Sequence, residues 1–269
     1  MVGWHANQRR RVVDRPREPL PTRVQDTPPL PSAYADALDA GLRTLGLELS
    51  ISARAAIDGH ARLLLAWTAA INLTAIRDPA AVALVHVVDS LSAIRVFRER
   101  ETERSVDLGS GGGYPGLPIA AALPMTRSLL IEPVAKKARF LSVAIAATGM
   151  AGSIEAAPVR AEALAADPRH RGQWPAVTAR AVAALPELIE LAFPLLAPDG
   201  YLVAWKRGDL GLELAAADRA MEALGGGSIE IRPVLGPGLE NHRLVIATAR
   251  GRVPAQYPRE PAVRKRRPW

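Results

Sequence analysis

Residues 106–124 read VDLGSGGGYPGLPIAAALP, with five glycines between a short apolar run and an alanine-rich run. A short apolar run followed by a helix-forming run is typical of a strand that turns directly into a helix. Glycine is required in such a turn where φ is positive or where a ligand approaches the main chain closely. We therefore predict a ligand-binding loop that contains Gly109, Gly111 and Gly113.

The chain after residue 104 repeats this alternation of apolar runs and helical stretches. The runs are SVDLG, SLLIE, SIEAAPV, AVTARA, GYLVAWK, SIEIRPVL and HRLVIATAR. Helix-like segments separate the first five, which predicts a parallel sheet with helices on both faces. The last two are joined by GPGLENH, which is too short for a crossover helix, so they should form an antiparallel hairpin. A seven-stranded α/β sheet of this kind is typical of the Rossmann-like class I methyltransferases.

The sequence before this sheet has a different character. From residue 34 to about residue 97, apolar residues recur at three-and-four spacing, which predicts a group of amphipathic helices. Residues 1–31 are rich in Arg and Pro without any period, which predicts a disordered extension. We therefore divide the chain into a disordered extension (1–31), a helical cap (32–100), a methyltransferase-type domain (101–250) and a basic tail (251–269).

The composition excludes several classes of protein. The chain has 269 residues, 49% of them hydrophobic, and can bury a full core. It has no cysteine, which excludes disulfides and thiolate chemistry, and its five scattered histidines make no metal motif, so we expect no metal site. Every apolar stretch of about 18 residues is interrupted by charge or proline, so we expect a soluble, cytoplasmic protein without a membrane span.

The formal net charge of +7 is unevenly distributed. Residues 1–31 carry +3 and residues 250–269 carry +6, so the segment between them carries −2. A near-neutral body with basic ends is typical of a protein that binds a polyanion through its ends. The alternative is that these ends only keep the protein soluble.

Two acidic residues lie at predicted strand ends beside the glycine loop. Glu132 ends the run SLLIE about twenty residues beyond the loop, where a carboxylate can bind both ribose hydroxyls of an adenosine. Its structural alternative is a helix-capping acid. Asp107 could bind the cofactor or hold the loop. With the loop and the strand order, these residues favour an adenosine-bearing cofactor.

Two other nucleotide motifs were tested against the loop. A triphosphate-binding motif fails because Leu117 and Pro118 follow Gly116, where it requires lysine and a hydroxyl residue. The spacing Gly111-x-Gly113-x-x-Gly116 matches a dinucleotide fingerprint, although it begins two residues late and contains a proline. An NAD-dependent oxidoreductase is therefore the alternative, but the chain lacks the Tyr-x3-Lys pair that it would need.

The chain resembles the bacterial 16S rRNA guanine-N7 methyltransferase family, also called glucose-inhibited division protein B. The blocks that carry the resemblance run from residue 34 to residue 268: INLTAIRDPAAVALVHVVDSL, VDLGSGGGYPGLPIA, EPVAKKARFL, RAE, TARAVAALPELIELAFPLL, AWKRG, NHRLVI and YPR. The resemblance implies S-adenosylmethionine as methyl donor and S-adenosylhomocysteine as product. It also implies a target in the 530 loop of 16S rRNA, guanine 527 in rRNA numbering.

The resemblance also implies which residues contact the cofactor. Glu132 stands where aspartate is common in the family, which lengthens its reach to the ribose. Ala161 and Glu162 would face the adenine. The complete set that we expect is Gly109, Gly111, Gly113, Tyr114, Glu132, Ala161, Glu162 and Arg180.

Basic residues near strand ends and in the tail are candidates for RNA contact. Lys206 could instead be a solvated surface residue, and Arg243 could pair with Glu240. The candidates are Arg180, Lys206, Arg207, His242, Arg243, Arg264, Lys265, Arg266 and Arg267. We expect a monomer whose partner is 16S rRNA or the small ribosomal subunit.

No catalytic base is required for the implied reaction. The N7 atom of guanine carries no proton, so its lone pair can attack the methyl group directly, and we assign no catalytic residue. His86 and Asp89 lie three positions apart on one helical face. They could be catalytic, or they could anchor a helical cap through a His–Asp hydrogen bond. A non-catalytic rRNA-binding factor is a further alternative, but it would predict a damaged loop or a missing ribose acid.

Overall fold

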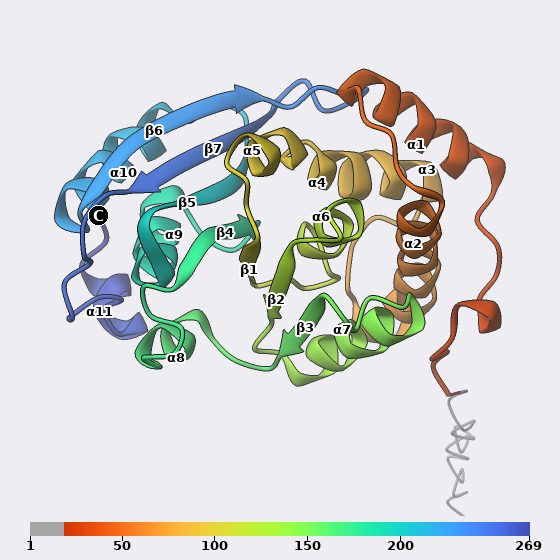
Figure 1. Ribbon diagram of the computed structural model, residues 1–269, viewed down its shortest axis with the longest axis horizontal. Helices are drawn as coiled ribbons and strands as arrows, with labels where there is room; N and C mark the ends of the chain where they lie inside the picture. The colour runs from red at the N-terminus through yellow and green to blue at the C-terminus, as the bar shows by residue number, and fades with distance from the viewer. Residues whose placement is uncertain (1–18) are drawn as a thin grey trace, which may run out of the picture.

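A computed structural model describes residues 19–269 and shows one seven-stranded sheet in the order β3-β2-β1-β4-β5-β7-β6 (Figure 1). The first five strands are parallel, and β7 pairs antiparallel with both β5 and β6. The predicted α/β class and the antiparallel hairpin are therefore confirmed. The strands are β1 (Arg104–Leu108), β2 (Arg127–Ile131), β3 (Ile154–Ala157), β4 (Trp174–Arg180), β5 (Leu196–Arg207), β6 (Gly226–Pro233) and β7 (His242–Ala249).

Helices cover both faces of the sheet because its central strands are apolar on both sides. One face packs against α6 and α7, and the other against α8, α9 and α10. Leu130 points to the first core and Leu129 to the second, as the alternation of a strand requires. These helices are α6 (Gly116–Ala122), α7 (Ala135–Ala147), α8 (Ala161–Ala166), α9 (Leu185–Ala192) and α10 (Gly211–Ala223), with a short 3₁₀ turn η3 (Phe193–Leu195) before β5.

The N-terminal helices extend the first of these two cores. Leu38, Trp67 and Val88 belong to the same buried cluster as Phe140 and Leu130. Ser50 caps the long second helix, since its hydroxyl accepts a hydrogen bond from the main-chain N–H of Ala53 at 3.1 Å. The helices are α1 (Ser32–Leu45), α2 (Ile51–Ile71), α3 (Pro79–Ala81), the π-helix η2 (Val82–Val88), α4 (Asp89–Leu91) and α5 (Ile94–Glu99).

The run Pro79–Glu99 is long and apolar enough, by length and composition alone, to cross a membrane. However, 61% of its most apolar window is buried inside the protein. Val82, Val87 and Leu91 all lie in the core shared with the sheet. A mostly buried apolar helix is what the core of a soluble protein contains, so this run is weak evidence for a membrane span.

Residues 19–31 are packed against α2. The indole Nε1 of Trp67 donates to the carbonyl oxygen of Pro21 at 2.7 Å, and Arg62 Nε donates to that of Pro28 at 2.9 Å. Thr27, just after the short 3₁₀ turn η1 (Val24–Asp26), is buried. The prediction of a disordered extension is therefore wrong for residues 19–31, because the buried indole of Trp67 and the half-buried guanidinium of Arg62 bind main-chain carbonyl oxygens of this segment. Its remainder, residues 1–18, lies outside the described residues.

Candidate functional site

The glycine loop follows β1 and has the backbone geometry that the sequence predicts. The φ angles of Gly109, Gly111 and Gly113 are 65°, 54° and 90°, a region that L side chains rarely adopt. A Cβ atom on Gly109 would lie 2.9 Å from Val182, and one on Gly113 would lie 2.6 Å from a methyl group of Leu117. Glycine is therefore needed here both for conformation and for space.

Asp107 fixes the loop from within the sheet. Its buried carboxylate accepts hydrogen bonds from the hydroxyl of Thr178 at 2.7 Å and from the main-chain N–H of Gly116 at 3.2 Å. Burial raises the pKa of Asp107 to about 6, and these hydrogen bonds oppose the rise. Of the two roles that the sequence left open for Asp107, the structure shows the one that holds the loop.

Glu132 joins the end of β2 to the same loop. One carboxylate oxygen accepts from the main-chain N–H of Gly111 at 3.0 Å and the other from that of Val134 at 2.8 Å. A carboxylate has about four acceptor positions, so two of them remain for a pair of hydroxyl groups. The side chain of Glu132 thus combines the helix-start contact with a capacity to bind a ribose, and the site fits an adenosine-bearing group.

A stack of three rings packs against the loop. The ring of Tyr114 contacts both histidine rings: that of His60 is tilted against it at a centroid distance of 4.5 Å, and that of His86 is stacked on it at 4.8 Å. Burial lowers the pKa of His60 to about 4, so the ring is neutral at physiological pH, and Nε2–H donates to the carbonyl oxygen of Gly112 at 2.7 Å. Tyr114 itself is buried, and burial raises its pKa. The stack therefore connects helix α2 and the π-helix to the loop.

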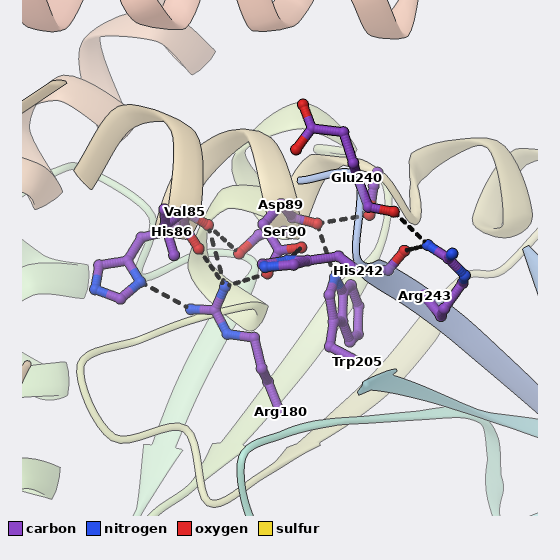
Figure 2. A network of polar contacts seen from close by, with 10 residues as sticks. Val85, His86, Asp89, Ser90, Arg180, Trp205, Glu240, His242 and Arg243 are labelled. Atoms are coloured by element: carbon purple, nitrogen blue, oxygen red, sulfur yellow. Dashed lines mark hydrogen bonds and ion pairs between the residues drawn. The ribbon is translucent and has the colours of Figure 1, made fainter. Parts of the chain in front are cut away.

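Asp89 is the centre of a buried polar network at the end of the π-helix (Figure 2). Its carboxylate accepts from Arg180 Nη1 at 3.0 Å and from His242 Nδ1 at 2.8 Å. Its carbonyl oxygen accepts from the indole of Trp205 at 2.7 Å. Asp89 is 1% exposed, and the network ties the ends of β4, β5 and β7 to the helical layer.

His86 does not form the His–Asp hydrogen bond that the sequence suggested. Its Nε2 lies 2.7 Å from the hydroxyl of Thr74, and its Nδ1 lies 3.4 Å from Arg180 Nη2. Burial, and then the charge of Arg180, lower the pKa of His86 to about 3. The prediction is corrected because the Asp89 carboxylate binds Arg180 and His242, so His86 reaches it only through the guanidinium (Figure 2).

The RNA candidates on strands divide into buried and exposed residues. Arg180 and His242 lie inside the Asp89 network rather than on the surface. Lys206 is also enclosed, since its Nζ donates to the carbonyl oxygen of Ala183 at 2.9 Å and lies 2.8 Å from the carboxylate of Glu213. Arg207 is exposed. Arg243 does bind Glu240, but through the main-chain carbonyl oxygen at 2.7 Å.

The tail is packed on the body and contains the short helix α11 (Pro261–Arg266). Arg264 is 9% exposed and lies between the carboxylates of Glu162 and Glu187, at 2.5 and 3.0 Å. The prediction that Arg264 contacts RNA is therefore corrected, because its guanidinium is buried and paired with two acids. Glu162 belongs to the first turn of α8, which begins with Ala161. The remaining tail candidates, Lys265, Arg266 and Arg267, are exposed.

A cavity of about 560 Å³ lies mainly at the amino-terminal ends of the strands, away from the glycine loop, and extends along β3 to Ala163 and Leu164 of α8. It is lined by Arg104 and Arg127, the first residues of β1 and β2, together with Trp174. Adenosine cofactors bind beyond the carboxyl ends of parallel strands, so this cavity is not the site built by the loop and Glu132. Within residues 19–269, no group of three or more His, Asp or Glu side chains could hold a metal ion.

Comparison with known proteins gives a consistent result. Residues 54–237 match the family model described as rRNA small subunit methyltransferase G. The chain is 39% identical to the ribosomal RNA small subunit methyltransferase G of Rubrobacter xylanophilus over 241 residues, which is 88% of this chain and 90% of the relative. It is also 39% identical to the protein of the same name from Roseiflexus sp. over 203 residues, 76% of this chain and 86% of the relative.

Among solved structures, an O-methyltransferase from Bacillus cereus, in complex with SAH, is similar in fold. Its TM-score is 0.52 and its sequence identity 15%, and the match covers 71% of this chain and 91% of that protein. At this identity the likeness concerns the fold alone.

Proposed function

The chain belongs to the rRNA small subunit methyltransferase G family, and from this premise we propose that it methylates N7 of guanine 527 in the 530 loop of 16S rRNA. Members of this family are S-adenosylmethionine-dependent rRNA methyltransferases. The observation that carries the proposal for this chain is the pairing of the glycine loop with Glu132, whose carboxylate has two further acceptor positions beside three glycines with positive φ. The free carboxylate positions of Glu132 suit the ribose hydroxyls of an adenosine.

The cofactor would be held by residues that follow three neighbouring strands. Gly109, Gly111 and Gly113 follow β1, Glu132 follows β2, and Ala161 and Glu162 follow β3. Tyr114 and Arg180 complete the proposed set from the ring stack and from the end of β4. When bound, S-adenosylmethionine supplies an electrophilic methyl group on a sulfonium, and S-adenosylhomocysteine remains as product.

The residues of the site act by positioning, and the proposed reaction requires no general base. The N7 atom carries no proton that would have to be removed. Alignment of the nucleophile with the methyl group can lower the barrier by up to roughly 7–11 kcal/mol. Two titratable groups near the loop already have structural partners: His60 donates to Gly112, and Asp107 accepts from Gly116 and Thr178. The buried network around Asp89 would keep Arg180 fixed beside the loop.

The RNA would be bound by exposed basic residues rather than by the buried ones. We assign this role to the exposed residues Arg207, Lys265, Arg266 and Arg267, and to Arg243, which is partly exposed. The concentration of positive charge in residues 250–269, which carry +6, supports this assignment. We further propose that the enzyme acts as a monomer in the cytoplasm, where its ribosomal substrate is found. Family membership leaves the oxidoreductase alternative without support.

Transfer of a tritiated methyl group from S-adenosylmethionine tests the proposal. The substrates are small ribosomal subunits and 16S rRNA from a strain that lacks the modification, with large subunits as the control. We expect label in 16S rRNA from the first two substrates only. With a Glu132→Ala variant we expect strongly reduced label when S-adenosylmethionine is not in excess. Cofactor binding without transfer to any of these RNAs would mean that the substrate is a different molecule. Binding of rRNA without any cofactor binding would support the non-catalytic alternative instead.

A further inference from the structure

The tail (residues 251–269) is anchored by a buried glutamate on α9. Glu190 is 0% exposed, and its carboxylate accepts from the main-chain N–H, Nε and Nη2 of Arg259 at 2.7, 2.9 and 2.6 Å. The indole of Trp269 donates to the same carboxylate at 2.7 Å. Burial would raise the pKa of Glu190, but these hydrogen bonds outweigh it and hold the pKa below its usual value. The tail is thus a specific part of the fold.

Arg264 reaches beyond this anchor to two further elements. Its Nη2 binds Glu162 on α8 at 2.5 Å, and its Nε binds Glu187 on α9 at 3.0 Å. Its Nη1 donates to the main-chain carbonyl oxygen of Arg259 at 2.5 Å. A planar guanidinium can serve three acceptors in fixed directions, which a lysine cannot do. Because Arg264 is 9% exposed, water competes little for these contacts.

The contact with Glu162 lies at one wall of the proposed cofactor site. Glu162 is the second residue of α8, which begins four positions after β3 ends. Glu132 follows β2, which is next to β3 in the sheet, and the glycine loop follows β1, one strand further on. Figure 1 shows α11 close to α8, although their sequences lie about a hundred positions apart. The tail therefore supports the start of the element that would face the adenine.

We propose that Arg264 is a positioning residue for cofactor binding: by holding Glu162 it fixes the start of α8 against the adenine of bound S-adenosylmethionine. This inference rests on the proposed function. The neighbouring Lys265 and Arg266 of α11, and Arg267 just after it, are exposed, so this segment has one buried arginine and an exposed basic surface. Arg264 thus has a different role from the other basic residues of the same run.

Calorimetric titration of the full chain with S-adenosylhomocysteine tests the inference. Arg264→Gln should raise the dissociation constant at least about tenfold, because a buried charged hydrogen bond to Glu162 is lost. Lys265→Gln removes the same charge from an exposed position of the same helix, and should leave the constant within about twofold. Combining Arg264→Gln with Glu162→Gln should add little to the effect of either change alone.

A purely structural role of Arg264 is distinguished by Glu187→Gln. This change weakens the anchor of the tail on α9 without touching α8, so it should lower the midpoint of thermal unfolding but leave affinity for S-adenosylhomocysteine nearly unchanged. Equal losses of affinity in Glu187→Gln and Arg264→Gln would overturn the inference, as would unchanged affinity in Arg264→Gln. If the unmodified chain bound no S-adenosylhomocysteine, the proposed function itself would fail together with the inference.

Discussion

Replacing Asp89 with alanine should be among the most destabilising changes in this fold. The carboxylate is 1% exposed, and it balances the guanidinium of Arg180, which is 13% exposed, at 3.0 Å. After the change, Arg180 would keep the carbonyl oxygens of Val85 and His86 but no counter-charge. Breaking a buried pair by removing one partner costs about 3–5 kcal/mol. His242 would lose its acceptor at the same time.

Urea unfolding followed by circular dichroism measures this loss. The free energy of unfolding should fall by about 3–5 kcal/mol. In thermal unfolding, the same loss should lower the melting temperature by roughly 6–20 °C in a protein of this size. Adding Arg180→Met to Asp89→Ala should recover part of the stability, because it removes the unpaired charge. The control is Asp26→Asn in the exposed Arg23–Asp26 pair, which should have no measurable effect.

The reasoning would be refuted if Asp89→Ala cost less than about 1 kcal/mol, which is the range of exposed ion pairs. It would also be refuted if the double variant were less stable than Asp89→Ala alone. Either result would mean that the Asp89 carboxylate in Figure 2 does not stabilise the fold by neutralising the charge of Arg180.

Three further predictions concern the residues around the loop. Burial lowers the pKa of His60 to about 4, so its neutral form stabilises the fold above the unfolded pKa near 6.5. This contribution of His60 should fall by roughly 3 kcal/mol as pH drops from about 6.5 to about 4; that of His86 changes in the same direction and that of Asp107 in the opposite one. The difference between the pH profiles of urea unfolding of the unmodified chain and of His60→Gln measures the His60 part. Gly113→Ala should lower the free energy of unfolding by about 1–3 kcal/mol, because φ is 90° and the new methyl group would meet His60. Gly152→Ala is the control, since a methyl group there would have open space and should leave stability nearly unchanged. Chemical unfolding of both variants measures the difference. Glu132→Ala removes the acceptor of the Gly111 N–H and the proposed ribose partner, so the dissociation constant for S-adenosylhomocysteine should rise roughly tenfold to a hundredfold or more, and Glu132→Asp, measured by the same titration, should retain part of the affinity.

Local sequence patterns were sufficient to predict the sheet and the loop. Each of the seven apolar runs forms a strand, because alternation or continuous apolarity decides whether a strand can be buried. Gly109, Gly111 and Gly113 adopt the positive φ that made them candidates. Glu132 could be found because a carboxylate at the end of the second strand has a fixed place relative to the loop.

Long-range pairings could not be predicted in the same way. Asp89 meets His242 across 153 positions, and Arg264 meets Glu162 across 102, so no spacing signals either contact. Arg264 and Lys265 are equivalent as residues of a basic run, and only the packing of α11 buries the one and exposes the other. A usable signal was present in α9, where Glu190 interrupts an apolar helix and therefore needed a buried partner.

The position of the methyl group on the RNA tests the central claim most directly. Small subunits that lack the modification are incubated with the enzyme and S-adenosylmethionine, and the 16S rRNA is reduced and cleaved at N7-methylguanosine, with the fragments identified by mass spectrometry. Our account predicts cleavage at guanine 527 in the 530 loop, and a mass increase of one methyl group on that base in a sample that has not been reduced and cleaved. A methyl group on another atom, on a ribose or in another region of the RNA would contradict it.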